Sequence, residues 1–307
     1  MLPGIINTHR KLFNILTIHQ EQCLSDCLRT SFTWSELPNT LCLAMNKKYF
    51  KEAALNENIR GIIAPPAAIL SGYRLNKVVV ACDKADELFY FLHNKKLHEI
   101  TNLQYPSALV SGIDPSARIA SSAILGKNIH IGENVTIHEG CIILDNTVIG
   151  RNSVIYHNVT MGTQGSFSKY ILGEKTHIEH FGGVRLGDNC VIHTGTNISR
   201  SANYGEYTAI GDNVHIGIQT NIGHDCKIGA GCDISAKVLL SGRVKLGSCC
   251  WIGAGVIISN SVSVGDKAKV RIGSVVIKDV PTGEEVSGNF AIRHSRNLRA
   301  FLGSENR

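Results

Sequence analysis

The chain has 307 residues, of which 43% are hydrophobic and 18% charged, a composition typical of a folded protein that excludes a disordered or low-complexity chain. Its net charge of +6 is small and dispersed, with no Lys/Arg run interleaved with aromatic residues, so we expect no nucleic-acid partner. No apolar stretch approaches the roughly 18 residues of a membrane-spanning helix and no signal-peptide core is present, so we expect no integral membrane segment and a cytoplasmic location.

Glycine divides the chain into two compositions. Of 30 glycines, only Gly4, Gly61 and Gly72 precede residue 110.

The ten cysteines include no CxxC pair. Disulfides are one reading of these cysteines, but buried reduced thiols fit their placement better.

Residues 1–110 predict a small α/β domain. Residues 21–31 have helical spacing, and residues 41–55 pass from a strand to a helix. The apolar runs at 61–70 and 77–83 predict strands, and residues 85–96 predict a helix.

Residues 111–282 carry an internal repeat of six residues. An aliphatic residue recurs every six positions from Ile113 to Met161, resumes at Leu186, and continues from Ile210 to Val276. A period of six fits neither a helix nor an alternating sheet. Three hexapeptides, each with a short strand and a turn, would make one triangular coil, and coils would stack through backbone hydrogen bonds. The sequence therefore predicts a left-handed parallel β-helix.

The fifth position of each hexapeptide also points inward and must be small. Five cysteines fall there, which predicts that they fill the core as small hydrophobic residues: Cys141, Cys190, Cys226, Cys232 and Cys250. The repeat is interrupted by a loop at residues 162–185, and such loops on a rigid scaffold are usually functional or form interfaces. Residues 283–307 read as a C-terminal turn and tail.

The hexapeptide pattern resembles the hexapeptide-repeat acyltransferase superfamily, in two of its branches. The N-terminal stretch, with LCLAMNKKY at 41–49, resembles the UDP-3-O-acylglucosamine N-acyltransferases of lipid A biosynthesis. That resemblance implies a nucleotide-recognition domain with Asn46 and Tyr49 at the nucleotide, while Lys48, with Lys47, could meet its diphosphate. A stacking Phe of that family is replaced here by Leu43, and its second histidine by Ser261.

The second branch comprises the sugar-nucleotide N-acetyltransferases of bacterial amino sugars. The segment NIGHDCKIGAGCDISAKVLLSGRVKLG resembles their catalytic coil, and VSGNFAIR resembles their terminal segment, with Phe290 in place of Pro. The chain lacks the long helical extension usual in the lipid A family. These departures favour a relative that uses a short acyl group on coenzyme A.

Acyl transfer from a thioester to an amine needs a general base, an oxyanion donor and proximity, but neither a metal nor a covalent intermediate. The resemblance assigns the base to His224, and Asp225 could orient it. It assigns the polarising N–H to Gly242, which lies 18 residues on and one coil above. His157 occupies the same hexapeptide position and is the rival base. A zinc site of the carbonic anhydrase type would need a histidine five residues after His224, where Gly229 stands.

The family's trimeric assembly implies that the acyl donor lies in the groove between neighbouring prisms. The residues expected near it are Gly242, Gly255, Gly273, Ser287, Gly288 and Asn289. We expect no bound cofactor, with acyl-CoA, in particular acetyl-CoA, as co-substrate and an acyl carrier protein thioester as the alternative donor.

Together these features predict a homotrimeric N-acyltransferase for a UDP- or TDP-linked amino sugar, in surface polysaccharide or O-antigen synthesis. The alternatives are a lipid A N-acyltransferase that uses a hydroxyacyl carrier protein, a sugar O-acetyltransferase, or a non-catalytic β-helix scaffold.

Overall fold

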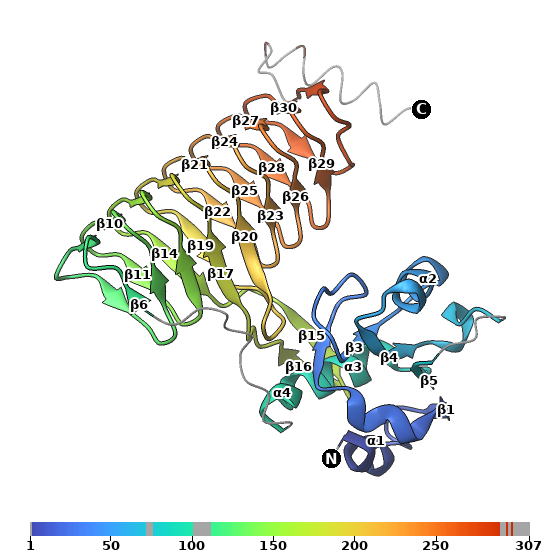
Figure 1. The fold of residues 1–307 in the computed structure, drawn as a ribbon. Coiled ribbons are helices and arrows are strands. Elements are labelled where there is room, and N and C mark those ends of the chain that lie inside the picture. Colours follow the sequence, from blue (N-terminus) through green and yellow to red (C-terminus); the bar gives the residue numbers. More distant parts are fainter. Residues whose placement is uncertain (1, 72–75, 101–111, 289–292, 294–295, 297–307) are drawn as a thin grey trace.

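The computed structural model describes residues 2–71, 76–100, 112–288, 293 and 296. Figure 1 shows a small domain of strands and helices beside a long prism of stacked coils. The expected donor residue Asn289, the neighbouring Phe290 and most of the tail lie outside the described residues. Among the described helices, none is long and apolar enough to span a membrane.

The N-terminal domain contains a five-stranded sheet in the order β1-β5-β4-β3-β2. Strand β1 pairs antiparallel with β5, and the other neighbours are parallel. The strands are β1 (Ile15–His19), β2 (Arg29–Ser31), β3 (Thr40–Leu43), β4 (Ile59–Ala64) and β5 (Val78–Cys82). The helices are α1 (Leu2–Thr8), η1 (Glu21–Asp26), α2 (Lys47–Leu55), η2 (Pro66–Ala68), α3 (Ala85–Asn94) and α4 (Leu97–Ile100).

Both faces of this sheet are covered, as expected for parallel strands. Leu41 and Ile63 pack with α3 on one face, whereas Cys42 and Ile62 pack with α2 on the other. The helical prediction for residues 21–31 is wrong in its second half. Only the short 3₁₀ helix η1 forms there, and the chain then enters β2 because its backbone pairs with β3.

The prediction of a left-handed parallel β-helix is confirmed. The prism has three parallel sheets, which we call faces 1, 2 and 3 in the order in which the chain visits them. Face 1 comprises β6 (Gly112–Ile113), β9 (His130–Ile131), β12 (Thr147–Ile149), β17 (Gly183–Leu186), β20 (Tyr207–Ile210), β23 (Lys227–Ile228), β26 (Lys245–Leu246) and β29 (Ser263–Val264). Face 2 comprises β7 (Arg118–Ile119), β10 (Thr136–Ile137), β13 (Val154–Ile155), β18 (Val191–Ile192), β21 (His215–Ile216), β24 (Asp233–Ile234), β27 (Trp251–Ile252), β30 (Lys269–Val270) and β32 (Glu285–Val286). Face 3 comprises β8 (Ile124–Leu125), β11 (Ile142–Ile143), β14 (Thr160–Thr163), β19 (Asn197–Ser199), β22 (Asn221–Ile222), β25 (Leu239–Leu240), β28 (Ile257–Ile258) and β31 (Val275–Val276).

The prism interior is filled by the residues that the repeat places there. The position-one aliphatics from Ile131 onward form one continuous buried cluster. The five inward cysteines named above are buried in that cluster, and all ten cysteines are free thiols. Burial raises the pKa of Cys226 to about 12, so this thiol is inert at neutral pH.

The interruption of the repeat is an arm, residues 164–182, between β14 and β17. It contains the antiparallel hairpin of β15 (Ser168–Ile171) and β16 (Glu174–His177). Ile171 and Ile178 of the arm are buried in the core of the N-terminal domain. The arm therefore joins the two bodies (Figure 1), because its apolar side chains complete the core beside α3.

A second junction lies one coil above the arm. Glu206, in the turn between β19 and β20, accepts hydrogen bonds from Ser31 Oγ at 2.5 Å and Ser35 Oγ at 2.7 Å. Burial raises the pKa of Glu206, and the two serine hydroxyls offset part of this effect. The N-terminal domain is thus tied to the prism by polar as well as apolar contacts.

Candidate active site

The candidate site lies on the edge of the prism where the chain passes from face 3 to face 1, which we call the 3–1 edge. The arm, the turn at 200–206 and the turns holding His224 and Gly242 follow one another along this edge. His224 stands between β22 and β23, and Gly242 stands between β25 and β26. Residues far apart in sequence are therefore neighbours here, because consecutive coils stack in register.

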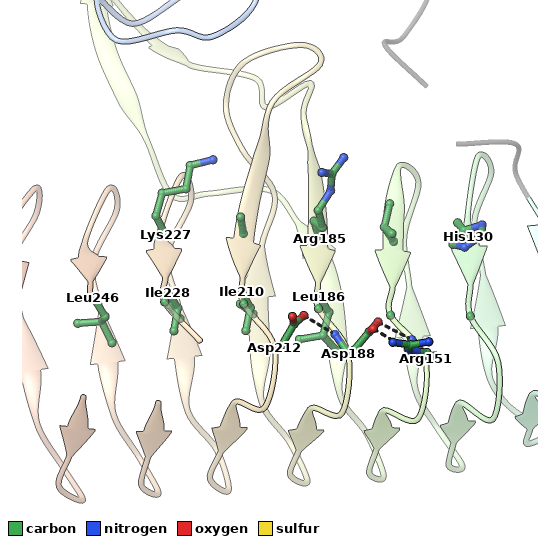
Figure 2. A pocket seen from close by; sticks show the side chains of 17 residues that line it. His130, Arg151, Arg185, Leu186, Asp188, Ile210, Asp212, Lys227, Ile228 and Leu246 are labelled. Carbon is green, nitrogen blue, oxygen red and sulfur yellow. Dashed lines mark hydrogen bonds and ion pairs between the residues drawn. The ribbon is translucent and has the colours of Figure 1, made fainter. Parts of the chain in front are cut away.

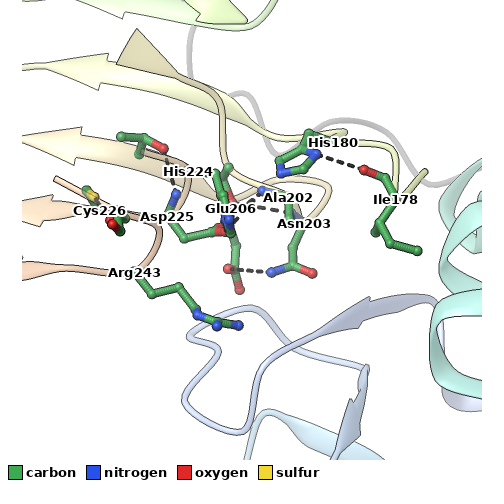
Figure 3. Close-up of polar contacts among 12 residues, drawn as sticks. Ile178, His180, Ala202, Asn203, Glu206, His224, Asp225, Cys226 and Arg243 are labelled. Carbon is green, nitrogen blue, oxygen red and sulfur yellow. Dashed lines mark hydrogen bonds and ion pairs between the residues drawn. The ribbon is translucent and has the colours of Figure 1, made fainter. Parts of the chain in front are cut away.

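His224 and Asp225 form a hydrogen-bonded pair (Figure 3). Nδ1 of His224 lies 2.6 Å from Oδ2 of Asp225, and their side chains are 17% and 7% exposed. Asp225 takes the left-handed corner position of its turn, with φ of 60°, which directs its carboxylate back to the neighbouring ring. An ionised carboxylate only accepts hydrogen bonds, so Nδ1 of His224 carries the proton and Nε2 is the free nitrogen.

Asp225 is itself held in place by the preceding coil. Its Oδ1 accepts hydrogen bonds from Ser201 Oγ at 2.5 Å and from the Ala202 N–H at 3.2 Å, and its own N–H donates to Thr208 Oγ1. Burial by itself would raise the pKa of Asp225, but its hydrogen bonds with His224 and Ser201 and the histidine charges hold it below the usual range. Asp225 is therefore a buried anion at neutral pH.

Gly242 lies directly against the ring of His224. A Cβ atom at position 242 would come within 2.4 Å of His224 Nε2, so only glycine leaves the ring where it is. The free nitrogen of His224 is thereby placed beside the backbone of the next coil.

Two side chains of the arm also pack against His224. The ring of His180 meets His224 at 4.9 Å between centroids in a T-shaped arrangement, and Phe167 stacks at 6.2 Å. Phe167 also lines a pocket of about 360 Å³ at the junction of prism, arm and N-terminal domain. This aromatic pocket therefore adjoins the histidine pair.

The aromatic pocket is lined by side chains from all three parts of the protein. Its lining residues are Phe32, Thr33, Trp34, Leu43, Met45, Tyr49, Asp86, Phe89, Tyr90, Phe167, Lys169, Arg243 and Ser261. Phe32 and Trp34 stack at 4.8 Å, with Arg243 over Phe32 and Lys245 over Trp34. Flat rings beside cations suit a nucleobase and a phosphate-bearing group.

The structure separates the three residues expected at the nucleotide. Tyr49 lines the aromatic pocket, 6.5 Å from Trp34 between ring centroids. Asn46 caps α2 by accepting a hydrogen bond from the Tyr49 N–H at 3.0 Å, which is a structural role. Asn46 and Lys48 instead line a separate open depression with Met45, Lys47 and Ala68.

Of the residues expected at the donor, Gly242 lies on the 3–1 edge, whereas the other described ones lie elsewhere on the prism. Gly255 follows β27 and Gly273 follows β30, so both stand where face 2 passes into face 3. Ser287 and Gly288 follow β32 on face 2. Both Gly255 and Gly273 have positive φ, and a Cβ at either position would meet no other atom within 4 Å. Within one chain they do not share a groove with Gly242.

The rival base His157 also lies at the passage from face 2 to face 3, distant in the fold from the 3–1 edge. It is 48% exposed and pairs with Glu139 at 3.1 Å. His138 lies beside them, and among the described residues these three place their ligand atoms within 4.8 Å of one another.

Face 1 carries a wide, open depression of about 980 Å³ (Figure 2). Arg185 of β17 and Lys227 of β23, two strands separated by β20, project on one side, and Asp212, Asp188 and Arg151 form a hydrogen-bonded ladder on the other. Arg185 and Lys227 also line a pocket with Trp34, so basic side chains extend from face 1 to the N-terminal domain.

Comparison with known proteins identifies the repeat. The family described as "Bacterial transferase hexapeptide (six repeats)" matches residues 128–163 and 207–242, and "Hexapeptide repeat of succinyl-transferase" matches residues 172–200 and 243–278. These matches lie almost entirely in the prism, whose repeats are similar to bacterial transferase hexapeptides. His224 and Gly242 both fall inside these matched hexapeptides, and the chain resembles hexapeptide-repeat acyltransferases.

Two solved structures of UDP-N-acetylglucosamine acyltransferases are similar to this chain. A UDP-N-acetylglucosamine acyltransferase from Francisella novicida is 29% identical, covers 63% of this chain and 72% of that one, and has a TM-score of 0.48. The corresponding Arabidopsis protein is 27% identical, covers 62% and 77%, and has a TM-score of 0.41. No curated protein matches the chain.

Several residues of the site escape prediction from the sequence. His180, Phe167, Trp34 and Arg243 belong to the arm, an N-terminal loop and a hexapeptide corner. In the sequence, His180 and Phe167 are marked only by the interruption of the repeat in which they lie. Arg243 is marked only by its place inside the segment that resembles a catalytic coil, and Trp34 is not marked at all.

Proposed function

We propose that this protein is an acyltransferase that moves an acyl group, acetyl or another short acyl, from a coenzyme A thioester to the amino group of a nucleotide-linked amino sugar. The observation that carries the proposal is the His224–Asp225 pair, which packs against Gly242 and adjoins an aromatic pocket between the two domains. The match of the prism to bacterial transferase hexapeptides supports the same reaction class.

His224 is the general base in this proposal. Its Nε2 accepts a proton from the sugar amine as the amine nitrogen attacks the thioester carbonyl carbon. The carbon–sulfur bond then breaks, and the proton held by His224 passes to the departing thiolate. Buried Asp225 stabilises the positive charge that the ring carries between these two steps.

Gly242 is the proposed oxyanion donor. A backbone N–H beside the base would stabilise the negative oxygen of the tetrahedral intermediate. The absence of a side chain at this position brings the two groups together, since a Cβ would contact His224 Nε2.

The aromatic pocket is the proposed site of the nucleotide sugar. Trp34, Phe32 and Tyr49 would contact the base, and Arg243 and Lys169 would meet the diphosphate. Leu43 replaces the stacking Phe of the lipid A family, and in this assignment the rings of a neighbouring loop would stack on the base instead. Tyr49 still contacts the nucleotide in this assignment, whereas Asn46 and Lys48 make no direct contact with it.

The donor site requires a second prism. Gly242 and the pair Gly255 and Gly273 lie on different edges of one chain. They could meet one pantetheine arm only if a neighbouring copy supplied the second set, which supports the homotrimer. Localisation in the cytoplasm and a role in surface polysaccharide synthesis remain part of the proposal.

The test is release of free thiol from acetyl-CoA, dependent on a UDP- or TDP-linked amino sugar. Amide formation on the sugar supports the proposal. Turnover only with hydroxyacyl carrier protein would instead identify a lipid A type N-acyltransferase, and an ester product would identify an O-acetyltransferase. A chain that forms neither product with any of these donors would be a non-catalytic scaffold.

A further inference from the structure

The arm contributes a second histidine to the neighbourhood of His224. His180 is 1% exposed, and its ring meets the ring of His224 in the T-shaped contact described above. The resemblance on which the site was first assigned gave His180 no role. Its contacts show how tightly the arm fixes this ring.

Gln164 at the start of the arm and His93 of α3 hold the backbone at residues 179 and 180. The side-chain amide of Gln164 makes two hydrogen bonds to it, accepting from the His180 N–H at 2.8 Å and donating to the His180 carbonyl at 3.1 Å. The preceding residue, Glu179, accepts at its carbonyl from His93 Nε2 of α3 at 2.8 Å. The position of His180 is therefore set by the N-terminal domain as well as by the arm.

The ring of His180 is held in one tautomer. Its Nδ1 lies 3.0 Å from the Ile178 carbonyl oxygen, which only accepts, so Nδ1 carries the proton (Figure 3). Its Nε2 is buried and has no hydrogen-bond partner among the described residues. A buried nitrogen without a hydrogen-bond partner loses its hydration with no compensation, which a purely structural position would be expected to avoid.

This ring stays neutral at physiological pH. Burial, followed by the charge of His224, lowers the pKa of His180 to about 4, although Asp225 acts in the opposite direction. His93 of α3 also faces it, and His177 lies 6.4 Å away between ring centroids. His180 therefore does not compete with His224 for the charge of Asp225.

Gly165 closes the space between the two rings. A Cβ at position 165 would lie 2.5 Å from His180 Nε2 and 3.1 Å from His224 Cδ2. No side chain fits there, so Gly165, His180 and His224 form one close-packed unit. Movement of the His180 ring would free the His224 ring to turn away from Asp225.

We propose that His180 is a positioning residue, whose neutral buried ring holds His224 in the orientation that hydrogen-bonds Asp225. The arm is then part of the catalytic machinery and not only an interdomain tie. The kinetic consequence rests on the proposed function, whereas the geometric claim about His224 does not.

The substitution His180→Asn tests this proposal, because the Asn amide can still donate to the Ile178 carbonyl while the ring that touches His224 is lost. His177→Asn is the matched control, since His177 is exposed on the same hairpin. His180→Phe keeps a ring of similar size in the contact. All three are checked for thermal unfolding before measurement, and Gly165→Ala, which displaces the His180 ring, replaces His180→Asn should that variant unfold.

The first readout is the low-field proton resonance of His224 Nδ1–H in the substrate-free protein, assigned by its loss in Asp225→Asn. We expect it to broaden or disappear in His180→Asn and to persist in His180→Phe and His177→Asn. The second readout is kcat with acetyl-CoA and the nucleotide sugar, expected to fall about tenfold or more in His180→Asn with KM for the sugar unchanged.

A wild-type resonance in His180→Asn, its loss in His180→Phe, or an equal loss in His177→Asn would overturn the proposal. An intact resonance pattern in an inactive wild-type protein would contradict the proposed function and leave the positioning role supported.

Discussion

The ring of His224 bonds to the carboxylate of its own chain neighbour, Asp225, at 2.6 Å. Adjacent residues seldom face each other, and here the left-handed φ of Asp225 makes it possible. Ser201 of the preceding coil then donates a hydrogen bond to the carboxylate, and Thr208 of that coil accepts one from the Asp225 N–H. A two-residue motif thus becomes an oriented acid–base pair through the stacking of coils.

The substitution Asp225→Asn is expected to lower kcat by about 10²–10³ while leaving KM for the sugar within a few fold. The amide carries no charge to stabilise protonated His224, and the tautomer of the ring is no longer fixed. Steady-state kinetics measure this effect. Asp233→Asn is the control, because Asp233 and His215 form an exposed pair on face 2 whose closest atoms are 3.9 Å apart. Equal losses in both variants would remove Asp225 from the mechanism.

Alanine substitutions at two glycines of the prism are expected to have different effects, one on activity and the other on stability. In Gly242→Ala the three atoms nearest to the new methyl group all belong to the movable ring of His224, so we expect a loss of activity of about tenfold or more with little change in the unfolding temperature. In Gly229→Ala the methyl group would lie 2.6 Å from the backbone of Gly247 in the next coil, so we expect lower stability. Calorimetry and kinetics on both variants check the pair of outcomes. An active Gly242→Ala enzyme would contradict the proposed closeness of base and oxyanion donor.

Trp34→Leu tests the aromatic pocket. Loss of the stacking partner of Phe32 is expected to raise the dissociation constant of the nucleotide about tenfold, at about 1–3 kcal/mol for a base–aromatic stack. Isothermal titration with UDP and TDP measures it. Trp251→Leu is the matched control, since Trp251 lies on face 2 beneath Arg271, away from the pocket. Unchanged affinity in Trp34→Leu would place the nucleotide elsewhere.

Stability is expected to fall as the pH is lowered from about 6.5 to about 4. The pKa of His98, through burial first, and the pKa of His180 are each lowered to about 4, and burial lowers that of His93 as well. In this window the unfolded chain, with histidine pKa values of about 6.5, binds protons that the folded protein excludes. The raised pKa of Glu206 makes the folded protein more stable on acidification, but it concerns one group, whereas three histidines act in the other direction.

The unfolding temperature measured from pH 7 to pH 4.5 checks this expectation. His98→Phe keeps a ring beside Tyr204 and Phe181 and should flatten the slope. His157→Asn, at an exposed site, should not. A midpoint that stays constant or rises on acidification would show that the buried histidines do not control the stability.

The sequence predicted the prism well because each hexapeptide repeats the same short strand and turn, with the same positions pointing inward. A single period fixes which residues point inward, so Cys226 and its counterparts could be assigned to the core. The roles of His224 and Gly242 came from the resemblance of their segment to a catalytic coil, and the repeat places the two residues one coil apart. Their contact is visible in the repeat itself.

The rest of the site depends on contacts that no local pattern encodes. Trp34 reaches the pocket only because β2 forms in a segment with helical spacing. His180 reaches His224 because Ile171 and Ile178 bury the arm in the N-terminal core. Asn46 matched a nucleotide motif, yet its side chain caps α2. Such placements require the packing of two domains and could not be read from spacing.

The central claim is that His224 takes the proton from the sugar amine. Thiol release from acetyl-CoA with a UDP- or TDP-linked amino sugar, measured for the wild-type protein and for His224→Ala, tests it most directly. We predict that the substitution lowers kcat by about 10²–10⁴ while the nucleotide still binds with wild-type affinity. Turnover by His224→Ala at the wild-type rate would contradict the mechanism.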